Sequence, residues 1–402
     1  MTGDEMFMAR AIQLAAAGRG SVQPNPMVGA VIVRDGRIVA EGFHRRFGGP
    51  HAEVEAIAAA SAAGVDIRGA AIYVTLEPCC HFGKTPPCTQ AIITAGLSRV
   101  VAAVQDVDPR VAGKGLQQLR QAGVEVQCGV LEPQARTLLE AYIKLRTSRR
   151  PWVICKWAQT ADGYLSLGHA PPLTPPAAAS PASLPAASPE PRWISGDQSR
   201  RKAHEIRGLC DAILVGIDTV LADDPLLNNR GGSGRQPVRI VLDSRLRIPA
   251  ASQLVKTARQ WPLIVATGPD AVASRPDAAA ALSACGAEVM PMPPMVGLQG
   301  AGPHICLEAL LDELGRRQMT YLLVEGGAAV LGSFIAADLA DELNVFISPR
   351  PLGQHLAGRP PGRDLPRLSL DDIAAGRRLD VRERIDLAGD TFVRAAFLPG
   401  AR

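Results

Sequence analysis

The chain has 402 residues, of which 47% are hydrophobic and 20% are charged. This length predicts two or three domains with ordinary buried cores, which excludes wholesale disorder and a small disulfide scaffold. The 43 basic and 39 acidic residues leave a net charge of only +4, so we expect no nucleic-acid partner. No apolar run approaches the roughly 18 residues that cross a bilayer, and the first residues lack the features of a secretory signal. We therefore expect a cytoplasmic protein without a membrane partner.

Helical and strand patterns alternate through the first part of the chain, which we assign to a domain over residues 1–147. The predicted helices are 5–18, 51–63, a helix beginning near 88, and 113–122. The predicted strands are 27–33, 37–41, 70–76, 99–104 and 124–127. Asp35-Gly36 signals a hairpin between the first two of these strands. This order predicts a central sheet with helices on both faces.

The polar segment from Thr147 to Pro151 marks a boundary, after which a second α/β series fills a domain over residues 151–402. Its predicted strands are 152–158, 211–216, 237–243, 262–267, 320–324 and 342–348, and its predicted helices are 197–208, 304–318 and 328–338. Residues 169–191 contain eight prolines among many Ala and Ser residues. Such a segment buries too little apolar surface to order itself, so we expect a flexible insertion.

The strongest chemical signal is His51-Ala-Glu53 followed by Cys79 and Cys88. One imidazole and two thiolates supply three of the four tetrahedral positions of Zn²⁺ and leave the fourth for water. Zinc lowers the pKa of that water, and a nearby glutamate that is not a ligand can move its proton. We therefore predict a hydrolytic zinc site with His51, Cys79 and Cys88 as ligands and Glu53 as the catalytic acid and base. This arrangement is typical of zinc nucleobase deaminases.

Two alternatives remain open from the residues alone. Cys80 or His81 would supply a fourth protein ligand and turn the site into a closed, non-catalytic structural zinc site. A zinc deaminase that acts on nucleic acid, with the second domain as an accessory, would need a basic groove with aromatic side chains. Only 4% of the residues are aromatic, which argues against that alternative.

The motifs resemble those of the bifunctional deaminase–reductases of riboflavin biosynthesis. The resemblance is carried by Pro24–Gly29, Gly42–His44 and, most specifically, the block Tyr73–Cys88 with its long spacing between Cys79 and Cys88. It continues through the segments Asp108–Gly115, Lys156–Gly163, Trp193–Ser195, Ala212–Pro225, Asp243-Ser244 and Val324–Gly327. The resemblance implies a cytidine-deaminase-like three-layer α/β/α domain followed by a dihydrofolate-reductase-like α/β domain.

The same resemblance implies the substrates, the cofactors and the remaining site residues. The first domain would deaminate a phosphorylated ribosylaminopyrimidine with Zn²⁺, and the second would reduce the ribosyl group of the product with NADPH. The NADPH contacts would be Gln159, Trp193, Thr219, Asp223, Ser244, Gly327, Ala328, Ala329, Val330, Leu331, Gly332 and Ser333. The substrate contacts would be Arg207, Leu227, Arg230 and Glu325. We also expect a homo-oligomer whose order the sequence does not set.

The residues themselves support part of this assignment. Gly326 and Gly327 follow an apolar strand and precede a predicted helix, a geometry that suits phosphate at a helix N-terminus. The full G-x-G-x-x-G fingerprint is absent, which argues against a Rossmann dehydrogenase. Arg207 and Arg230 carry guanidinium groups that bind phosphate oxygens in pairs. Ser244 and Arg245 follow a predicted strand, where they are candidates to bind a 2′-phosphate.

Overall fold

The computed structural model describes residues 2–83, 86–165, 194–230, 235–294, 305–352 and 365–398. The chain forms two compact units, of which the first comprises Met1–Pro151 with Leu314–Thr320 and the second comprises Trp152–Glu313 with Tyr321–Arg402. The predicted insertion at 169–191 and Trp193 lie outside the described residues.

The first unit is built on a five-stranded sheet with the strand order β2-β1-β3-β4-β5 among its described residues. Its strands are β1 (Gly29–Arg34), β2 (Arg37–Phe43), β3 (Ala71–Val74), β4 (Arg99–Ala102) and β5 (Glu125–Cys128). Strand β1 runs antiparallel to both β2 and β3, while β3, β4 and β5 run parallel. The carboxyl ends of β3 and β4 therefore meet at one edge of the sheet, where the loops that carry the chemistry begin.

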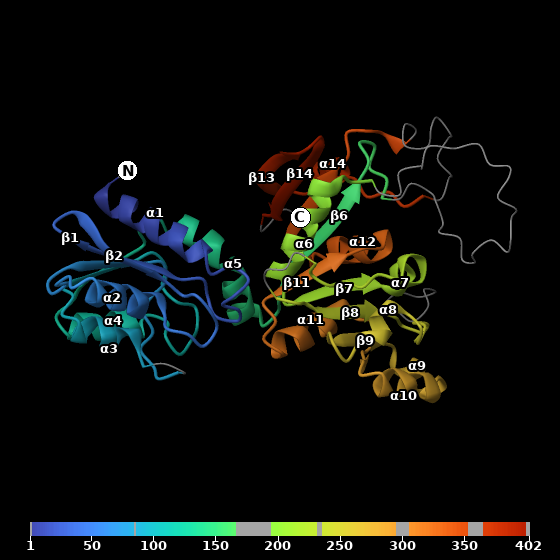
Figure 1. The fold of residues 1–402 in the computed structure, drawn as a ribbon, viewed down its shortest axis with the longest axis horizontal. Coiled ribbons are helices and arrows are strands. Elements are labelled where there is room, and N and C mark those ends of the chain that lie inside the picture. The colour runs from blue at the N-terminus through green and yellow to red at the C-terminus, as the bar shows by residue number, and fades with distance from the viewer. Residues whose placement is uncertain are drawn as a thin grey trace, which may run out of the picture. The chain divides into compact units, whose positions relative to one another are not determined.

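Helices cover both faces of this sheet, as the sequence predicts (Figure 1). The helices are α1 (Gly3–Ala16), α2 (Ala52–Ala62), α3 (Cys88–Thr94), α4 (Lys114–Gln121) and α5 (Glu132–Ser148). On one face, Met8 of α1 and Leu139 of α5 pack against Val31 and Val101 of the strands. On the other face, Ala56, Ile92 and Leu116 of α2, α3 and α4 form a second apolar core. Helix α5 is not predicted from the sequence, and it runs into the expected domain boundary.

The second unit contains a nine-stranded sheet in its described part, with the order β10-β9-β8-β7-β11-β6-β12-β14-β13. The first seven strands in this order are parallel to their neighbours, and β14 pairs antiparallel with β12 and with β13. The strands are β6 (Trp152–Gln159), β7 (Ala212–Gly216), β8 (Val238–Leu242), β9 (Leu263–Thr267), β10 (Glu288–Pro291), β11 (Tyr321–Glu325), β12 (Glu342–Ile347), β13 (Leu379–Leu387) and β14 (Asp390–Phe397). Strands β7, β9 and β11 are buried along their whole length, which is typical of parallel strands covered on both faces.

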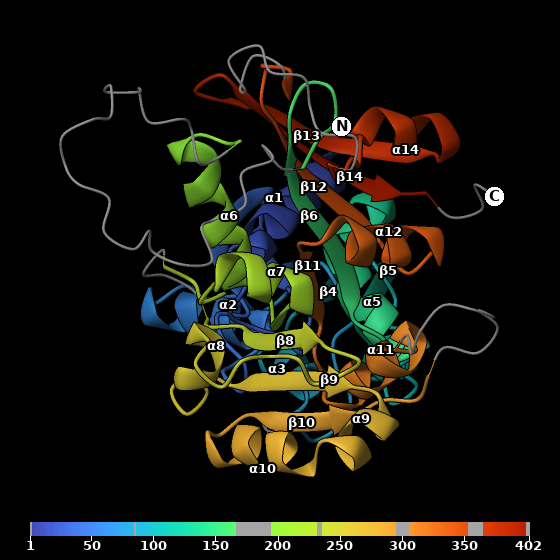
Figure 2. The ribbon, with the colours of Figure 1, turned by 90° about the vertical axis from the view of Figure 1, so that its right-hand side faces the viewer.

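The helices of the second unit connect these strands (Figure 2). They are α6 (Asp197–Leu209), α7 (Ile217–Asp223), α8 (Gln253–Lys256), α9 (Pro269–Ser274), α10 (Pro276–Ala284), α11 (Leu307–Arg316), α12 (Ala328–Ala336) and α14 (Leu370–Gly376). The six strands and three helices predicted from the sequence all form, with ends shifted by a few residues. Neither β10 nor the C-terminal hairpin of β13 and β14 is predicted from the sequence.

Candidate functional site

The three predicted metal ligands meet at the carboxyl edge of the first sheet. His51 is the residue that caps α2, Cys79 follows β3, and Cys88 is the first residue of α3. The Nδ1 atom of His51 lies 3.2 Å from Cys88 Sγ and 3.5 Å from Cys79 Sγ, and all three donor atoms lie within 4.8 Å of one another. The usual Zn–N and Zn–S bonds in a tetrahedral site separate such atoms by about 3.6 Å. The donor set therefore fits a zinc ion.

The two thiols are not equivalent in the metal-free protein. The backbone N–H of Cys88 donates to Cys79 Sγ at 3.3 Å. Hydrogen bonding from the Cys88 thiol, together with His51, lowers the pKa of Cys79 to about 4. The same hydrogen bond, together with burial, raises the pKa of Cys88 well above its ordinary value. Cys79 is thus the thiolate of the pair, and binding of a metal ion would release the proton of Cys88.

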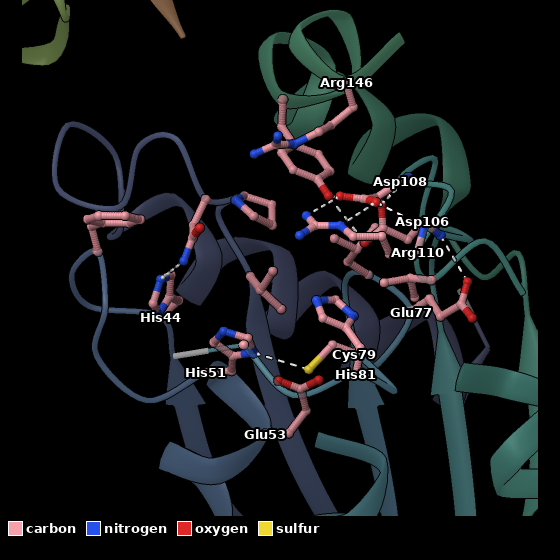
Figure 3. A pocket seen from close by; sticks show the side chains of 18 of the residues that line it. His44, His51, Glu53, Glu77, Cys79, His81, Asp106, Asp108, Arg110 and Arg146 are labelled. Atoms are coloured by element: carbon pink, nitrogen blue, oxygen red, sulfur yellow. Dashed lines mark hydrogen bonds and ion pairs between the residues drawn. The ribbon is translucent and has the colours of Figure 1, made fainter. Parts of the chain in front are cut away.

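Glu53 lies in the first turn of α2, and only 3% of its surface is exposed. Figure 3 shows its carboxyl group beside His51 and Cys79. Burial raises the pKa of Glu53 to about 7, because a charged carboxylate loses its hydration there. A carboxyl group with this pKa can accept and return a proton near neutral pH.

These residues line a cavity of about 410 Å³. Figure 3 shows His51, Glu53 and Cys79 at one end of the cavity and Arg110 and Arg146 toward the other. The remaining polar lining residues include Asn25, His44, His81, Asp106, Asp108 and Tyr142. The cavity therefore combines a metal-binding end with an end that carries guanidinium groups.

A second cluster of charged residues lies in the second unit, where Arg207 comes from α6, Lys156 from β6 and Glu325 from β11. Arg207 donates to both carboxylate oxygens of Glu325, at 3.0 and 2.6 Å, and Lys156 Nζ lies 3.7 Å from the same carboxylate. Burial alone would raise the pKa of Glu325, but Arg207 and Lys156 outweigh burial and lower it to about 2. The pKa of Lys156 is lowered by burial. Glu325 therefore stays charged at neutral pH.

A glycine pair follows Glu325 at the carboxyl end of β11. Gly326 and Gly327 have φ angles of +106° and +71°, which side chains rarely allow. Gly327 begins α12 without a side-chain cap, so the first amide groups of this helix lack side-chain acceptors and are suited to bind an anion. A Cβ atom on Gly326 would lie 3.1 Å from Thr219 Oγ1. Thr219 of α7 thus lies against the glycine turn. The amide groups at the start of α12 fit the phosphates of a dinucleotide.

Two family models match the chain in the same order as the two units. The cytidine and deoxycytidylate deaminase zinc-binding region matches residues 1–104. The RibD C-terminal domain matches residues 151–375, which is more than half of the chain. The riboflavin biosynthesis protein RibD of Actinobacillus pleuropneumoniae is 39% identical over 360 residues, which cover 89% of this chain and 86% of that protein. The chain belongs to the RibD family. RibD of Aquifex aeolicus is 40% identical over 355 residues, with 88% and 89% coverage.

Solved structures agree with this assignment. The diaminohydroxyphosphoribosylaminopyrimidine deaminase/5-amino-6-(5-phosphoribosylamino)uracil reductase of Thermotoga maritima matches with a TM-score of 0.74 and 35% identity. RibD of Acinetobacter baumannii matches with a TM-score of 0.76 and 32% identity. Each match covers 98% of this chain and 99% of the other. The family, the fold class and the bifunctional deaminase–reductase assignment predicted from the sequence are confirmed, and the nucleic-acid deaminase is not favoured.

Neither residue proposed as a fourth zinc ligand joins the donor set. Within the described part of the chain, the group of atoms that can hold a metal consists of His51, Cys79 and Cys88. The Cys80 thiol instead donates to the backbone oxygen of Arg110 at 3.8 Å, and His81 lines the cavity. Separately, no helix of the described ranges is long and apolar enough to cross a membrane.

The expected NADPH contacts in the described residues lie on several elements of the second unit. Buried Gln159 ends β6, where its Oε1 atom accepts from Trp157 Nε1 and from the Leu370 amide. Asp223 ends α7 and is exposed, and Ser244 follows β8. The residues from Gly327 to Ser333 begin α12, and among them the side chain of Leu331 is fully buried in the core.

The expected substrate contacts fall into two groups. Arg207 and Glu325 form the ion pair described above. Leu227 is buried and has a φ angle of +52°. Arg230 is exposed, and its backbone N–H donates to His204 Nδ1 at 3.5 Å. The structure therefore places Arg207 and Glu325 in direct contact, while Arg230 and Leu227 lie on the loop that follows α7.

Asn25 and His44 have no role predicted from the sequence, although both belong to the motifs that carry the resemblance. His44 Nδ1 donates to the Pro50 oxygen at 2.8 Å, so its Nε2 atom accepts from Asn25 Nδ2 at 3.1 Å. Burial lowers the pKa of His44, which keeps this ring neutral. Both residues line the deaminase cavity. Their presence in short motifs beside the zinc ligands is the signal that points to them.

Glu77 is a further residue whose role is not predicted from the sequence. Its buried carboxylate accepts hydrogen bonds from the backbone amides of Asp106, Gly113, Gly115 and Leu116, at 2.9–3.2 Å. These amides belong to the loop between β4 and α4 and to the first turn of α4, and that loop also lines the cavity. Glu77 therefore ties the strand that leads to Cys79 to the opposite wall of the cavity. Its position in Thr-Leu-Glu-Pro-Cys is the only sequence signal.

Proposed function

We propose that the first unit hydrolyses the exocyclic amine of 2,5-diamino-6-ribosylamino-4(3H)-pyrimidinone 5′-phosphate. The second unit then reduces the ribosyl group of the product, 5-amino-6-(5-phosphoribosylamino)uracil, to a ribityl chain with NADPH. The observation that carries the proposal is the position of Glu53 beside three converging zinc-type donors at one end of a cavity. The Thermotoga maritima relative is named for the same two activities.

In the deaminase unit, His51, Cys79 and Cys88 would hold Zn²⁺. When bound, this ion supplies a water molecule of lowered pKa and positive charge for the developing anion. Glu53 would accept one proton while the water oxygen bonds to the ring carbon that bears the amine, and would donate this proton to the ring nitrogen. It would then carry the second proton of the same oxygen to the departing amine. The C–N bond breaks, and ammonia leaves with the proton that Glu53 has delivered. A pKa of about 7 for Glu53 suits both directions of this transfer.

The remaining residues of the cavity would bind and orient the substrate. Neutral His44, held by Pro50 and Asn25, and Asp106, which accepts from Tyr142 at 3.0 Å, provide polar atoms for the amine and carbonyl groups of a pyrimidinone. Arg110 and Arg146 lie at the end away from the zinc donors (Figure 3). Guanidinium groups at that end suit the 5′-phosphate of the substrate.

In the reductase unit, NADPH supplies a hydride when bound. The ion pair of Arg207 and Glu325 presents both hydrogen-bond donors and a fixed carboxylate to the hydroxyl groups of the ribosyl chain. Lys156 adds a buried positive charge beside Glu325. Leu227 and Arg230 would complete the substrate contacts. On the cofactor side, the contacts would be Gln159, Trp193, Thr219, Asp223, Ser244 and the segment from Gly327 to Ser333.

The partners of this enzyme would be small molecules and a second copy of the chain. The proposed deaminase substrate is a single phosphorylated ribosylaminopyrimidine, which the cavity of about 410 Å³ in the first unit can admit. We include a homo-oligomer in the proposal, and light scattering after size-exclusion chromatography would test it. A mass near 42.3 kDa at all concentrations would contradict it.

A two-step assay tests the proposed function. The purified chain with zinc should release ammonia from the diaminopyrimidinone substrate without NADPH. It should oxidise NADPH only after that release, with ribityl product in equal amount. Oxidation of NADPH by the substrate before deamination, or ammonia release from cytidine or a tRNA in its place, would contradict the proposed order and substrate. Each half reaction is measured separately, so that a failure is assigned to one unit.

A further inference from the structure

Asp106 lines the deaminase cavity, and neutral donors hold its carboxylate in place. It lies in the loop between β4 and α4, and only 7% of its surface is exposed. The backbone N–H of Asp108 donates to Oδ1 at 2.9 Å. The hydroxyl of Tyr142 donates to Oδ1 at 3.0 Å and to Oδ2 at 3.2 Å. Because this hydroxyl shares one hydrogen between the two oxygens, the carboxylate keeps the capacity to accept a further hydrogen bond.

The two carboxylates near Asp106 have stronger partners within the protein. Glu77 accepts the four backbone amides described above, and one of them, at 3.1 Å, is the amide of Asp106 itself. Asp108 accepts from Nε and Nη2 of Arg110, at 2.9 and 2.6 Å. Glu77 therefore fixes the backbone of Asp106, while the Tyr142 hydroxyl contacts its side chain. Of these three carboxylates, Asp106 is the one best able to accept a hydrogen bond from a ligand.

Tyr142 presents its hydroxyl from a well-packed ring. It belongs to α5 and stands 36 positions after Asp106 in the chain. Its ring belongs to the apolar core that also contains Phe7 and Leu139. Arg146, one turn further along α5, lies over the ring with its guanidinium carbon 5.3 Å from the ring centroid. Because the core and Arg146 hold the ring, the hydroxyl stays in one place and fixes the rotation of the Asp106 carboxylate.

We propose that Tyr142 is a positioning residue of the deaminase, whose hydroxyl orients the Asp106 carboxylate to accept a hydrogen bond from an N–H group of the pyrimidinone. The inference rests on the proposed function, which assigns this cavity to that substrate. Figure 3 shows Asp106 beside Arg110 and away from Glu53. We therefore expect Tyr142 to affect substrate binding and to leave the proton transfers at Glu53 unchanged.

The hydroxyl also bears on the charge of Asp106. Burial raises the pKa of Asp106, and the nearby carboxylates of Asp108 and Glu77 raise it further, whereas the Asp108 amide and the Tyr142 hydroxyl lower it. The charged side chains of this part of the cavity are Glu77, Asp108, Arg110 and Arg146. Loss of the hydroxyl should raise the pKa of Asp106, so that this carboxylate becomes neutral at a higher pH than in the wild type.

Replacement Tyr142→Phe in the full-length, zinc-loaded protein tests the proposal, because it keeps the ring and removes the hydroxyl. We measure ammonia release from 2,5-diamino-6-ribosylamino-4(3H)-pyrimidinone 5′-phosphate. KM should rise about tenfold, at the lower end of the effect of a lost hydrogen bond to a charged group. The value of kcat and the zinc content should stay close to those of the wild type, as expected for a loss of binding alone. The ratio of the two KM values should grow as the pH falls from 8 to 5.

A double-mutant cycle tests whether Tyr142 acts through Asp106. Replacement Asp106→Asn should itself raise KM, because an amide replaces the charged acceptor. In that background, Tyr142→Phe should add less than about twofold, since residues that act as a unit give non-additive effects. A full additional rise would show that Tyr142 binds the substrate itself, and would overturn the positioning role.

Replacement Tyr73→Phe is the matched control. Tyr73 is buried in the same apolar core and donates to Asp4 Oδ1 at 2.6 Å, but it is not among the described residues that line the cavity. This variant also loses a hydrogen bond between a buried tyrosine and a carboxylate, so it reports a general loss of stability. Its KM should equal that of the wild type. An equal rise of KM in both tyrosine variants would overturn the proposal.

The remaining outcomes separate the positioning role from the proposed function. A wild-type protein that releases no ammonia from this substrate overturns the proposed deaminase function itself. An active wild type with an unchanged KM in Tyr142→Phe overturns only the positioning role. Because KM does not depend on the amount of active enzyme, a partly unfolded preparation still gives this reading. A rise of KM that is absent from Tyr73→Phe and disappears in the Asp106→Asn background supports the proposal.

Discussion

The two units each bury a glutamate at their candidate site, and the two carboxyl groups have opposite properties. Glu53 of the first unit has its pKa raised to about 7 by burial. Glu325 of the second unit is also buried, but Arg207 and Lys156 lower its pKa to about 2. Where burial outweighs the neighbouring imidazole of His51, the carboxyl group exchanges protons at neutral pH. Where two cations outweigh burial, the carboxylate keeps a permanent charge. The first arrangement suits proton transfer, and the second suits ligand binding.

We expect the largest effect from a replacement that tests whether the activity of the first unit, and not that of the second, depends on a metal ion. Replacement Cys88→Ala removes one of three zinc donors, so we expect loss of bound zinc and no measurable ammonia release. The second unit shares none of these ligands, and reduction of the separately prepared deaminated substrate should be unchanged. Metal analysis would measure the bound zinc, and separate assays of the two half reactions would measure the two activities. Full retention of zinc by Cys88→Ala would show that the donor set is wrong.

Replacement Glu53→Gln tests the proton-exchanging glutamate. The amide cannot accept the proton of a zinc-bound water, so deamination should fall by about 10²- to 10⁴-fold, the usual contribution of a general acid or base. Zinc content should stay at the wild-type level because Glu53 is not a ligand. Wild-type deamination rates in this variant would show that Glu53 does not transfer the proton.

Replacement Glu325→Gln tests the charge-holding glutamate. It leaves Arg207 buried beside a neutral group, so the second unit should lose about 3 kcal/mol of stability, or roughly 6–12 °C in Tm. In the wild type, the depressed pKa of Glu325 means that this stabilisation is present above the ordinary glutamate pKa of 4.5 and is lost as the pH falls toward 2.

Calorimetric melting at pH 7, 5 and 3 measures both effects. The Tm difference between wild type and Glu325→Gln should be similar at pH 7 and 5 and should shrink at pH 3. A difference that grows as the pH falls would contradict the low pKa. Arg136→Gln, which removes an exposed ion pair with Glu132 in the first unit, is the control and should shift the Tm of neither unit noticeably.

Replacement Glu77→Gln tests the loop that forms one wall of the deaminase cavity. In the wild type, these backbone N–H groups donate to the Glu77 carboxylate. The glutamine side chain replaces one acceptor oxygen with an NH₂ donor, so the segment from Asp106 to Leu116 should lose its fixed position. We expect KM for the deaminase substrate to rise about tenfold, with a smaller change in kcat and with zinc retained, since one such hydrogen bond contributes about 1–3 kcal/mol. An unchanged KM would show that Glu77 does not position this wall.

The smallest expected effect is that of Cys80→Ala. The Cys80 sulfur lies outside the set of converging donors, so zinc content and both activities should equal those of the wild type. Zinc loss in this variant would favour a closed structural site in the first unit.

The candidate site of the first unit is the part that the sequence predicts best. Zinc requires His and Cys side chains, and these residues lie in one stretch between His51 and Cys88, next to strands and helices with clear periodicity. The reductase cluster is less visible because its residues come from β6, α6 and β11. Lys156 and Glu325 become neighbours only through the parallel register of β6 and β11, which no local pattern encodes.

Other elements escape sequence analysis for physical reasons. Helix α5 begins after Leu131, whose φ angle is positive, and carries Pro133 in its first turn, so its start resembles a turn. Strand β13 has no buried residue, is rich in charged side chains and lies at the edge of the sheet, so its alternation of apolar residues is weak. The hydrogen bonds to Glu77 join residues more than 25 positions apart, and only the folded chain brings them together.

X-ray absorption at the zinc edge of the purified protein tests the central claim most directly. The account predicts one zinc per chain with two sulfur neighbours at about 2.3 Å and two lighter neighbours at about 2.0–2.1 Å, one from His51 and one from solvent. Glu53→Gln should give the same spectrum. A third sulfur neighbour, or a second histidine in place of solvent, would contradict an open catalytic zinc site in the first unit.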